Sequence, residues 1–464
     1  MTLLVFGMDG AVREYVEEAI DRGLMPNLEK FMEEGSFGEL ESTTPPVTIP
    51  AWVSMFSGLQ PDKFDTFHMT AMDRDYNVGV NQSRKWRGRM AWDRLEGSFG
   101  VINVPGTSPV WELDGFMLEG FPMVEDPDCY PSELLEELPE MEFENVREKP
   151  TREGRRKALF KNFDRRKKAF AELDRDSDVR IEVYQLTDTM AHKSDSLDEV
   201  LEAYEKVDEV LGDRMEQYDN VLLVSDHGFT HVDRYFYINT WLEKNGFLAR
   251  KQSNTGKRTV QKLLGPLAET PLRPVLKKLN DIISSETGVD FSPKSGALDE
   301  IDFEKTEAFS YLRGTANYAD ININDSRWAS GPVENREEVA ERVKEEMEKE
   351  EFVEEVMLRE EIYDEPENMP DLIVKTDENT AIGPPLFSKT LFRTNAFVHS
   401  KVGIYGTYGP AFRSGELEDA DIVDVAPTLA KYLGQELDVD GSPLDVFAED
   451  FESRTVSDVS GIEF

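Results

Sequence analysis

Cysteine is almost absent from this 464-residue chain, whose only residue of this type is Cys129. A single thiol excludes an intrachain disulfide and a thiolate metal cluster, and it suits a reducing compartment. Long apolar runs are also missing, since no run of about 18 apolar residues could span a bilayer. The opening stretch, MTLLVFGMDG, lacks the basic and apolar regions of a signal peptide. We therefore expect a cytoplasmic protein without a membrane span.

Basic residues are scarce relative to acidic ones. The chain has 52 Lys plus Arg against 94 Asp plus Glu, which gives a formal net charge of -42. Such a surface repels nucleic acids and anionic membranes, so neither is an expected partner. The acidic residues are spread along the whole chain, which is typical of a protein that works in molar salt, where screening weakens charge repulsion. We expect a halophilic protein, and an ordinary acidic protein is the alternative.

The alternation of short apolar runs with helical patterns predicts the fold. Helical patterns cover residues 12–34, 197–218 and 336–351, the last with one solvated face. The apolar runs typical of strands buried on both faces are 3–8, 100–103, 181–186, 221–224, 371–374 and 402–405. This order predicts an α/β fold with a mostly parallel central sheet and helices on both faces.

The sheet and its helices are expected to form one domain over residues 1–464, with two insertions. Residues 126–178 are charged and helical in pattern. Residues 241–300 contain a locally basic stretch, KQSNTGKRTVQKLLGPLAETPLRPVLKKLND. We expect the second insertion to form a cap or lid, because segments added to a rigid scaffold often carry substrate choice.

Histidine is rare as well, with five residues in the chain, yet three of them flank predicted strands. Carboxylates occupy similar places, and ligands of open α/β sheets bind at the carboxyl ends of strands. The residues concerned are Asp9, Asp188, His192, Asp226, His227 and His399. Carboxylate and neutral imidazole suit zinc, and also manganese or iron, and this set is sufficient for two ions. For Asp226 and His227 alone, a polar turn is the competing interpretation.

Thr48 precedes a predicted helix at 51–56 in the stretch TTPPVTIPAWVSMFSG, residues 43–58. Pro50 suits a first helical turn, so Thr48 lies at or just before a helix N-terminus, where backbone amides favour an anion such as phosphate. The hydroxyl is either a helix cap or, beside metal ions that lower its pKa, a nucleophile.

Together these motifs resemble the alkaline phosphatase superfamily, and most closely its nucleotide pyrophosphatase/type I phosphodiesterase branch. The resemblance covers residues 3–60, 100–122, 180–240 and the segment from 395 towards the end. It is carried by Asp9, TTPPVTIPAW, DTMAH at 188–192, SDHGF at 225–229, the late His399 with GIYGTYGPAF, and the elements DIVDVAPTLAKYLG and DVDGSPL. The first five of these, which occur in the family's order, are together more specific than any one of them.

The resemblance implies two divalent metal ions, expected to be zinc, with manganese or iron as alternatives. One ion would be held by Asp188, His192 and His399. The other would be held by Asp9, Asp226 and His227, with Thr48 Oγ on it as the nucleophile. The implied substrate is a small phosphorylated molecule, such as a nucleotide or nucleotide sugar.

The chain also departs from the family pattern. Phe397 stands two residues before His399, where the family usually has glycine. DKFDTFHM follows SGLQP, where relatives often read xHGIxDN, so the side-chain amide that stabilises phosphate is missing there. Asn103 or His68 could substitute for it, but each is explained equally well as a structural residue. His231 lies beyond the ligand pair and has a weaker case.

The activity implied is hydrolysis of a phosphoric ester, with a phosphodiesterase expected first. The stretches VTIPAWVSMF and NVPGTSPVW contain no Lys or Arg, which favours diesters over more highly charged monoesters. The basic insertion at 250–278 would counter this preference if it folded over the site and supplied a cation. A phosphomutase or phosphotransferase of the same superfamily is the first alternative, and a non-catalytic protein braced by metals is the second. A sulfatase is disfavoured because position 48 is Thr rather than a modified Cys or Ser.

Overall fold

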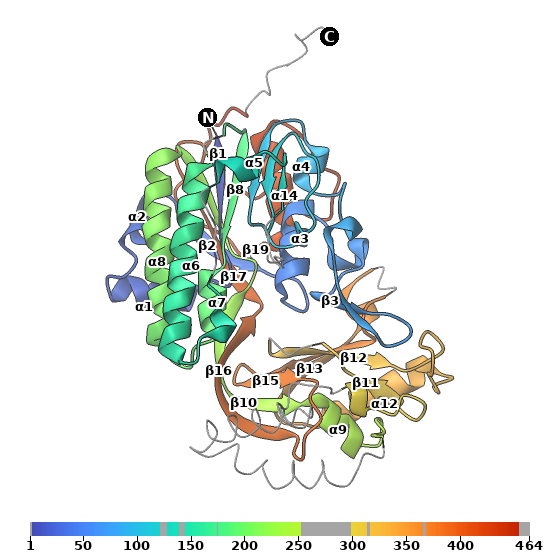
Figure 1. The fold of residues 1–464 in the computed structure, drawn as a ribbon. Coiled ribbons are helices and arrows are strands. Elements are labelled where there is room, and N and C mark those ends of the chain that lie inside the picture. The colour runs from blue at the N-terminus through green and yellow to red at the C-terminus, as the bar shows by residue number, and fades with distance from the viewer. Residues whose placement is uncertain are drawn as a thin grey trace. The chain divides into compact units, whose positions relative to one another are not determined.

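The computed structural model describes residues 2–120, 128–138, 144–173, 175–251, 298–312, 316–364 and 368–453. The chain divides into two compact units, which Figure 1 draws as ribbons. The first unit comprises Met1–Met69, Asn81–Phe229 and His399–Phe464, and the second comprises Thr70–Val80 and Thr230–Val398. Among the described helices, none is long and apolar enough to cross a bilayer.

A ten-stranded mixed sheet forms the centre of the first unit, in the order β18-β2-β17-β9-β1-β8-β5-β6-β7, with β19 beside β2. The inner strands β9, β1, β8, β5 and β6 run parallel to one another, whereas β17 is antiparallel to β9 and β2. The strands are β1 (Leu3–Met8), β2 (Ser36–Glu41), β5 (Phe99–Ile102), β6 (Gly115–Leu118), β7 (Cys129–Tyr130), β8 (Val179–Tyr184), β9 (Asn220–Val224), β17 (Val402–Tyr408), β18 (Gly415–Glu416) and β19 (Ala420–Asp421).

Helices cover both faces of this sheet (Figure 1). One layer contains α1 (Arg13–Asp21), α2 (Pro26–Glu34), α6 (Arg152–Glu172), α7 (Leu186–Ala191) and α8 (Leu197–Gln217), and the other contains α3 (Thr48–Ser57), α4 (Ala91–Arg94) and α14 (Val425–Tyr432). The short α5 spans Leu134–Glu137. Every residue of β1, β8 and β9 is buried, because both sheet faces are covered, and this explains their continuous apolar runs. The predicted α/β fold is confirmed.

The second unit contains two smaller sheets and a hairpin. One sheet has the order β15-β10-β16 and the other β11-β12-β14-β13. The strands are β3 (Thr70–Met72), β4 (Val78–Val80), β10 (Gly228–Tyr237), β11 (Ala308–Phe309), β12 (Tyr318–Ile323), β13 (Val353–Leu358), β14 (Leu372–Thr376), β15 (Thr380–Gly383) and β16 (Leu391–Ser400). The α-helices in its described residues are α9 (Ile238–Lys244), α12 (Arg336–Met347) and α13 (Arg359–Ile362).

Three expectations about single elements are wrong in detail. The pattern at 12–34 forms two helices, because Gly23, with φ of 70°, and Pro26 interrupt it. The strand predicted at 181–186 ends at Tyr184, and Leu186 already begins α7. The strand predicted at 371–374 is β14, which pairs antiparallel with β12 and β13 in the second unit rather than joining the central sheet.

The predicted insertions stay predictions. Helix α6 lies within the first, at 126–178. Of the second, at 241–300, residues 252–297 lie outside the described part of the chain, so the cap or lid expected there has no structural description. The helix predicted at 336–351 is α12, and it buries Val339, Ala340, Val343 and Met347.

Candidate active site

The carboxyl ends of three neighbouring strands bring three carboxylates together in the first unit. Strand β1 pairs in parallel with β8 on one side and β9 on the other, so the residues that follow these strands meet at one edge. The backbone N–H of Asp188 donates to the Asp9 carbonyl at 3.1 Å. The N–H of Gly10 donates to Asp226 Oδ1, also at 3.1 Å. These bonds tie the loops after all three strands to one another.

The three histidines reach the same edge from different elements. His192 caps the C-terminus of α7, His227 follows Asp226 directly, and His399 lies at the end of β16. His227 Nδ1 lies 3.1 Å from the Gly228 carbonyl, and His399 Nδ1 lies 3.0 Å from the Pro46 carbonyl. A carbonyl can only accept, so Nδ1 carries the proton in both rings and Nε2 keeps a free lone pair.

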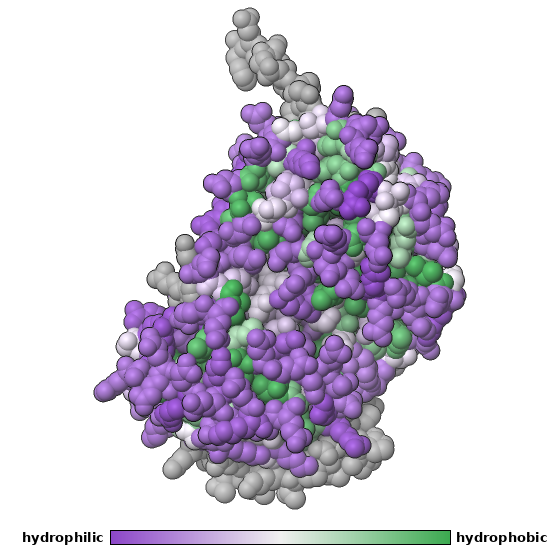
Figure 2. Space-filling view, turned by 180° about the vertical axis from the view of Figure 1, so that it is seen from behind, coloured by the Kyte–Doolittle hydropathy of each residue, from purple (hydrophilic) through white to green (hydrophobic). Residues whose placement is uncertain are grey.

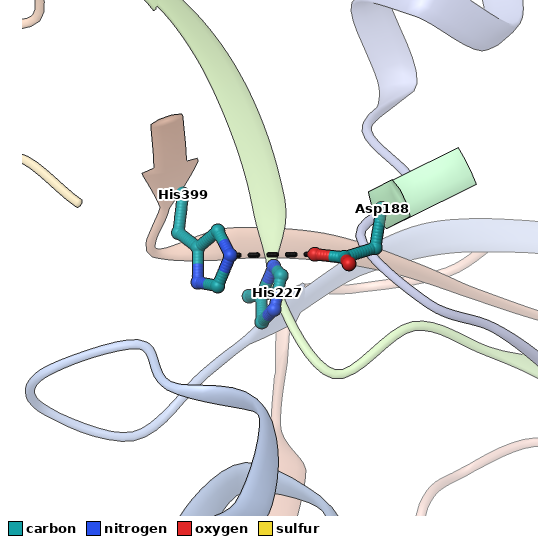
Figure 3. A group of neighbouring side chains, drawn as sticks. All are labelled: Asp188, His227 and His399. Carbon is teal, nitrogen blue, oxygen red and sulfur yellow. Dashed lines mark ion pairs between the residues drawn. The ribbon is translucent and has the colours of Figure 1, made fainter. Parts of the chain in front are cut away.

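The donor atoms converge on two neighbouring positions. One set of atoms within 4.8 Å of one another comes from Asp188, His227 and His399, and another comes from Asp9, Asp226 and His227. In Figure 3, Asp188 and His399 face each other, with His227 beside the line that joins them. His192 Nε2 is 3.2 Å from Asp188 Oδ1 and 2.7 Å from His399 Nε2. All six predicted ligands therefore lie together, and His227 adjoins both sets rather than one.

These residues fit a pair of cations. Each carboxylate keeps one buried oxygen that accepts no hydrogen bond from a described residue: Asp9 Oδ1, Asp188 Oδ1 and Asp226 Oδ2. Within the described part of the chain, the ion pairs of these three carboxylates are all with histidines. Buried anionic oxygens without a cationic partner are costly, and a divalent ion would offset that cost. Imidazole nitrogen with carboxylate oxygen is a donor set that suits zinc, manganese or iron.

Burial and the closeness of the carboxylates to one another also shift the pKa values of the site residues. Burial, followed by the charges of Asp226 and Asp188, raises the pKa of Asp9 well above its ordinary value. Burial and the Asp188 charge likewise raise the pKa of Asp226. Burial also acts to raise the pKa of Asp188, but His192 and His399 outweigh it and hold that pKa well below its ordinary value. Burial lowers the pKa of His227 and His399, so both rings are neutral at pH 7.

Thr48 is the first residue of α3, whose ten residues are all buried. Its Oγ lies 3.3 Å from His227 Nε2, and its residue is 7% exposed. The hydroxyl therefore stands beside the donor atoms, at a helix end whose backbone amides favour an anion. Its side chain makes no capping hydrogen bond of the kind that the alternative interpretation requires, because the N-cap residue is Val47.

Two further residues of the site were missed by sequence reasoning. Trp52 Nε1 donates to Asp9 Oδ2 at 3.3 Å, and the Phe229 ring contacts all three histidines. Trp52 follows Thr48 by four positions, a spacing that places both on one side of a helix. Phe229 belongs to the SDHGF motif that was noted for its ligands. Both residues belong to sequence motifs already identified for Thr48 and for the metal ligands.

The weaker sequence candidates lie outside these sets. The Asn103 side chain donates to the Val183 carbonyl at 2.7 Å, and the residue adopts a positive φ of 58° at the end of β5, which indicates a structural role. His68 is buried and belongs to neither donor set. His231 lies in the second unit, exposed, with Nε2 at 2.5 Å from Asn395 Oδ1.

Comparison with known proteins adds independent findings. The model of the family described as type I phosphodiesterase / nucleotide pyrophosphatase matches residues 3–384. The structure of murine ectonucleotide pyrophosphatase / phosphodiesterase 5 aligns over 95% of this chain and 98% of its own, with a TM-score of 0.55 and 14% identity. An inactive variant of the murine protein, in complex with AMP, aligns over 95% and 97%, with the same TM-score and identity. A search of curated proteins finds no match.

Proposed function

The chain belongs to the type I phosphodiesterase / nucleotide pyrophosphatase family and is a phosphoric ester hydrolase, and we propose that it acts through Thr48 beside two divalent metal ions. The observation that carries the proposal is the position of Thr48 Oγ, 3.3 Å from His227 Nε2 and next to three carboxylates with unsatisfied oxygens. Asp188, His192 and His399 would hold one ion. Asp9, Asp226 and His227 would hold the other, with Thr48 Oγ adjoining it.

The proposed residues have distinct tasks. Thr48 Oγ attacks phosphorus in line with the leaving oxygen, so that a Thr–O–P bond forms as the ester P–O bond breaks. The N-terminal amides of α3 favour the negative charge on the phosphoryl oxygens. Bound divalent ions supply charge neutralisation and lower the pKa of the hydroxyl and of water. Attack of water on phosphorus then breaks the Thr–O–P bond, releases phosphate or a phosphomonoester, and returns a proton from the water to Thr48 Oγ.

The surroundings of Thr48 favour diesters over monoesters. A phosphomonoester carries about two negative charges at pH 7, and a diester carries one. Helix α3 surrounds Thr48 with buried apolar residues, including Ile49, Pro50 and Trp52. The three carboxylates add negative charge, and no described Lys or Arg forms an ion pair with them. A nucleotide-like diester is the substrate class we propose, in keeping with the AMP bound by the inactive murine protein.

We propose further that the two ions are zinc, that the protein is cytoplasmic and that its source is halophilic. The imidazole and carboxylate donors support zinc, with manganese or iron as alternatives. The net charge of -42 supports function in molar salt, and the face drawn in Figure 2 is predominantly hydrophilic, with apolar residues in small groups.

Thr48→Ala tests the nucleophile. We expect kcat to fall by at least about a thousandfold, because no other group replaces the attacking oxygen. Thr48→Ser keeps a hydroxyl and should retain measurable turnover. Ser57→Ala, at the other end of the same helix, is the matched control and should stay within about twofold of the parent. If Thr48→Ala keeps a tenth or more of the activity in molar salt with Zn²⁺ or Mn²⁺, Thr48 is not the nucleophile.

The substrate preference needs a separate measurement. We expect kcat/KM for bis-p-nitrophenyl phosphate to exceed that for p-nitrophenyl phosphate by about tenfold or more, since no described Lys or Arg forms an ion pair at the site that could meet the extra charge of a monoester. Both substrates should be compared on one preparation. A monoester that wins by tenfold would replace the diesterase assignment with a phosphatase or mutase.

A further inference from the structure

The Phe229 ring lies among the three histidines of the site. Its centroid is 5.1 Å from that of His192, 5.7 Å from that of His227 and 5.0 Å from that of His399. The corresponding interplanar angles are 74°, 63° and 73°, so each contact is edge-to-face. The side chain is almost fully buried, with 2% of the residue exposed. One phenyl ring therefore contacts histidines assigned to both proposed ions.

The same ring packs against the backbone that follows Asp9. Gly10 has φ of 71°, and a Cβ added there would lie 2.5 Å from Phe229 Cε2 and 2.9 Å from Cδ2. These distances are too short for any side chain, so the ring directly covers the glycine backbone. Phe229 cannot shift towards Gly10 when an imidazole presses on it. The ring is thus held between a tight turn on one side and the imidazoles on the other.

The restraint on the three imidazoles is unequal. His227 and His399 each have a second anchor, through Nδ1 and the carbonyls of Gly228 and Pro46. His192 has no hydrogen bond at Nδ1 from the described residues, and its side chain is 29% exposed. Rotation of its ring is therefore limited by the contacts of Nε2 with Asp188 and His399 and by packing against Phe229. Phe229 supplies a larger share of the restraint for His192 than for the other two.

We infer that Phe229 is a positioning residue that holds the site histidines, and His192 above all, in the orientation that metal binding requires. The inference rests on the metal site of the proposed function. An imidazole binds a cation only when the Nε2 lone pair points at it, and groups that orient ligands commonly change metal affinity by about 10- to 100-fold. Loss of the ring should therefore weaken the ion bound by His192 more than the ion bound by His227.

The experiment compares metal binding in matched variants of the full chain in molar salt. Phe229→Leu removes the ring, and Phe229→Met removes it while keeping similar volume. Phe99→Leu is the control, because Phe99 is fully buried at the start of β5, the end of that strand opposite to the carboxyl edge where the site lies. Zn²⁺ affinities for both ions are measured by competition with a chelator. The visible spectrum of the Co²⁺-loaded protein reports the coordination geometry independently of activity.

For the parent protein and Phe99→Leu, we expect two ions with affinities that agree within about twofold. In both Phe229 variants, one ion should bind about 10- to 100-fold more weakly, the other should change less, and the Co²⁺ spectrum should shift. The variant His192→Asn removes a ligand of one ion only, so the ion whose affinity it lowers is the one to compare with the ion weakened in the Phe229 variants. In that background Phe229→Met should have little further effect on it, because two changes that act through one ligand are not additive.

Each other outcome has a definite meaning. A parent protein that fails to bind two ions contradicts the proposed metal site itself. A parent that binds two ions while Phe229→Met retains both affinities within twofold overturns the role of Phe229. Equal weakening in Phe99→Leu also overturns it, since the effect would then be general core loosening. If Phe229→Leu does not fold by circular dichroism, Phe229→Met decides.

Discussion

The hydrogen bond between Trp52 and Asp9 offers a quantitative test of the site. Trp52 Nε1 donates to Asp9 Oδ2 at 3.3 Å, and both residues are fully buried. Asp9 Oδ1, the other oxygen, accepts no hydrogen bond from the residues that the structure describes and is the one available to a cation. The indole N–H therefore favours the ionised carboxylate that metal binding requires. Trp52→Phe removes the donor and leaves an aromatic ring that can still stack on Phe56.

The expected loss follows from the geometry. A hydrogen bond to a charged group contributes about 1.5–3 kcal/mol, and a separation beyond the usual range of about 2.7–3.2 Å places this one at the lower end. A loss of about 1.4 kcal/mol corresponds to about tenfold. We therefore expect Trp52→Phe to weaken the more affected ion about tenfold at pH 7. The assay is competition with a chelator at constant molar salt.

A matched control separates the hydrogen bond from lost volume. Trp92 is also buried in the first unit, at 3% exposure, and its Nε1 has no hydrogen-bond partner in the described part of the chain. Trp92→Phe removes the same atoms without removing a bond to a carboxylate, so its metal affinity should stay within about twofold of the parent. Equal affinities for Trp52→Phe and the parent, or an equal loss in Trp92→Phe, would refute the reasoning.

Three further predictions concern the whole protein. Raising the salt concentration from low to molar should raise Tm, because screening relieves repulsion among 94 acidic residues; a flat or falling curve would reject the halophilic interpretation. Removal of metal with a chelator should abolish turnover and lower the free energy of unfolding. The free energy should fall by about 2.7 kcal/mol relative to protein with the ion at 100 times its Kd, and readdition of Zn²⁺ or Mn²⁺ should restore both properties. Full activity after verified removal would contradict the metal site. Burial raises the pKa of Asp320 from 3.8 to about 6, so the native state holds this proton more tightly than the unfolded chain and loses stability as pH rises from about 4 to 6. A pKa difference of about two corresponds to about 3 kcal/mol. Asp320→Asn should therefore lower the free energy of unfolding, measured with denaturant, by about 3 kcal/mol less at pH 7 than at pH 4. A loss that is equal at both pH values would show that Asp320 does not titrate in this way.

The sequence alone determined five strands of the central sheet, β1, β5, β8, β9 and β17, and the polar residues at its edge. Strands β1 and β9 are buried on both faces, so their apolar runs are continuous and short-range pattern was sufficient to locate them. The change from apolar to polar at Asp9 and Asp226 marks where these strands end. Because parallel strands share one carboxyl edge, the order of the motifs predicted that these carboxylates meet.

Local pattern was insufficient where a segment could join more than one sheet. Strand β14 has the same apolar character as a central strand, but its partners are β12 and β13 in the second unit. Strand pairing depends on side chains far away along the chain, which a local window does not contain. The same limit applies to α1 and α2, where Gly23 and Pro26 interrupted a helical pattern that appeared continuous.

The arrangement of the site was decided only by tertiary structure. Gly10 N and Asp226 Oδ1 are 216 positions apart, and register between β1 and β9 brings them within 3.1 Å. That register places His227 beside both donor sets. The contacts of Trp52 with Asp9, and of Phe229 with the histidines, arise in the same way. Residue types follow from sequence, whereas orientation depends on packing between elements that are distant in the chain.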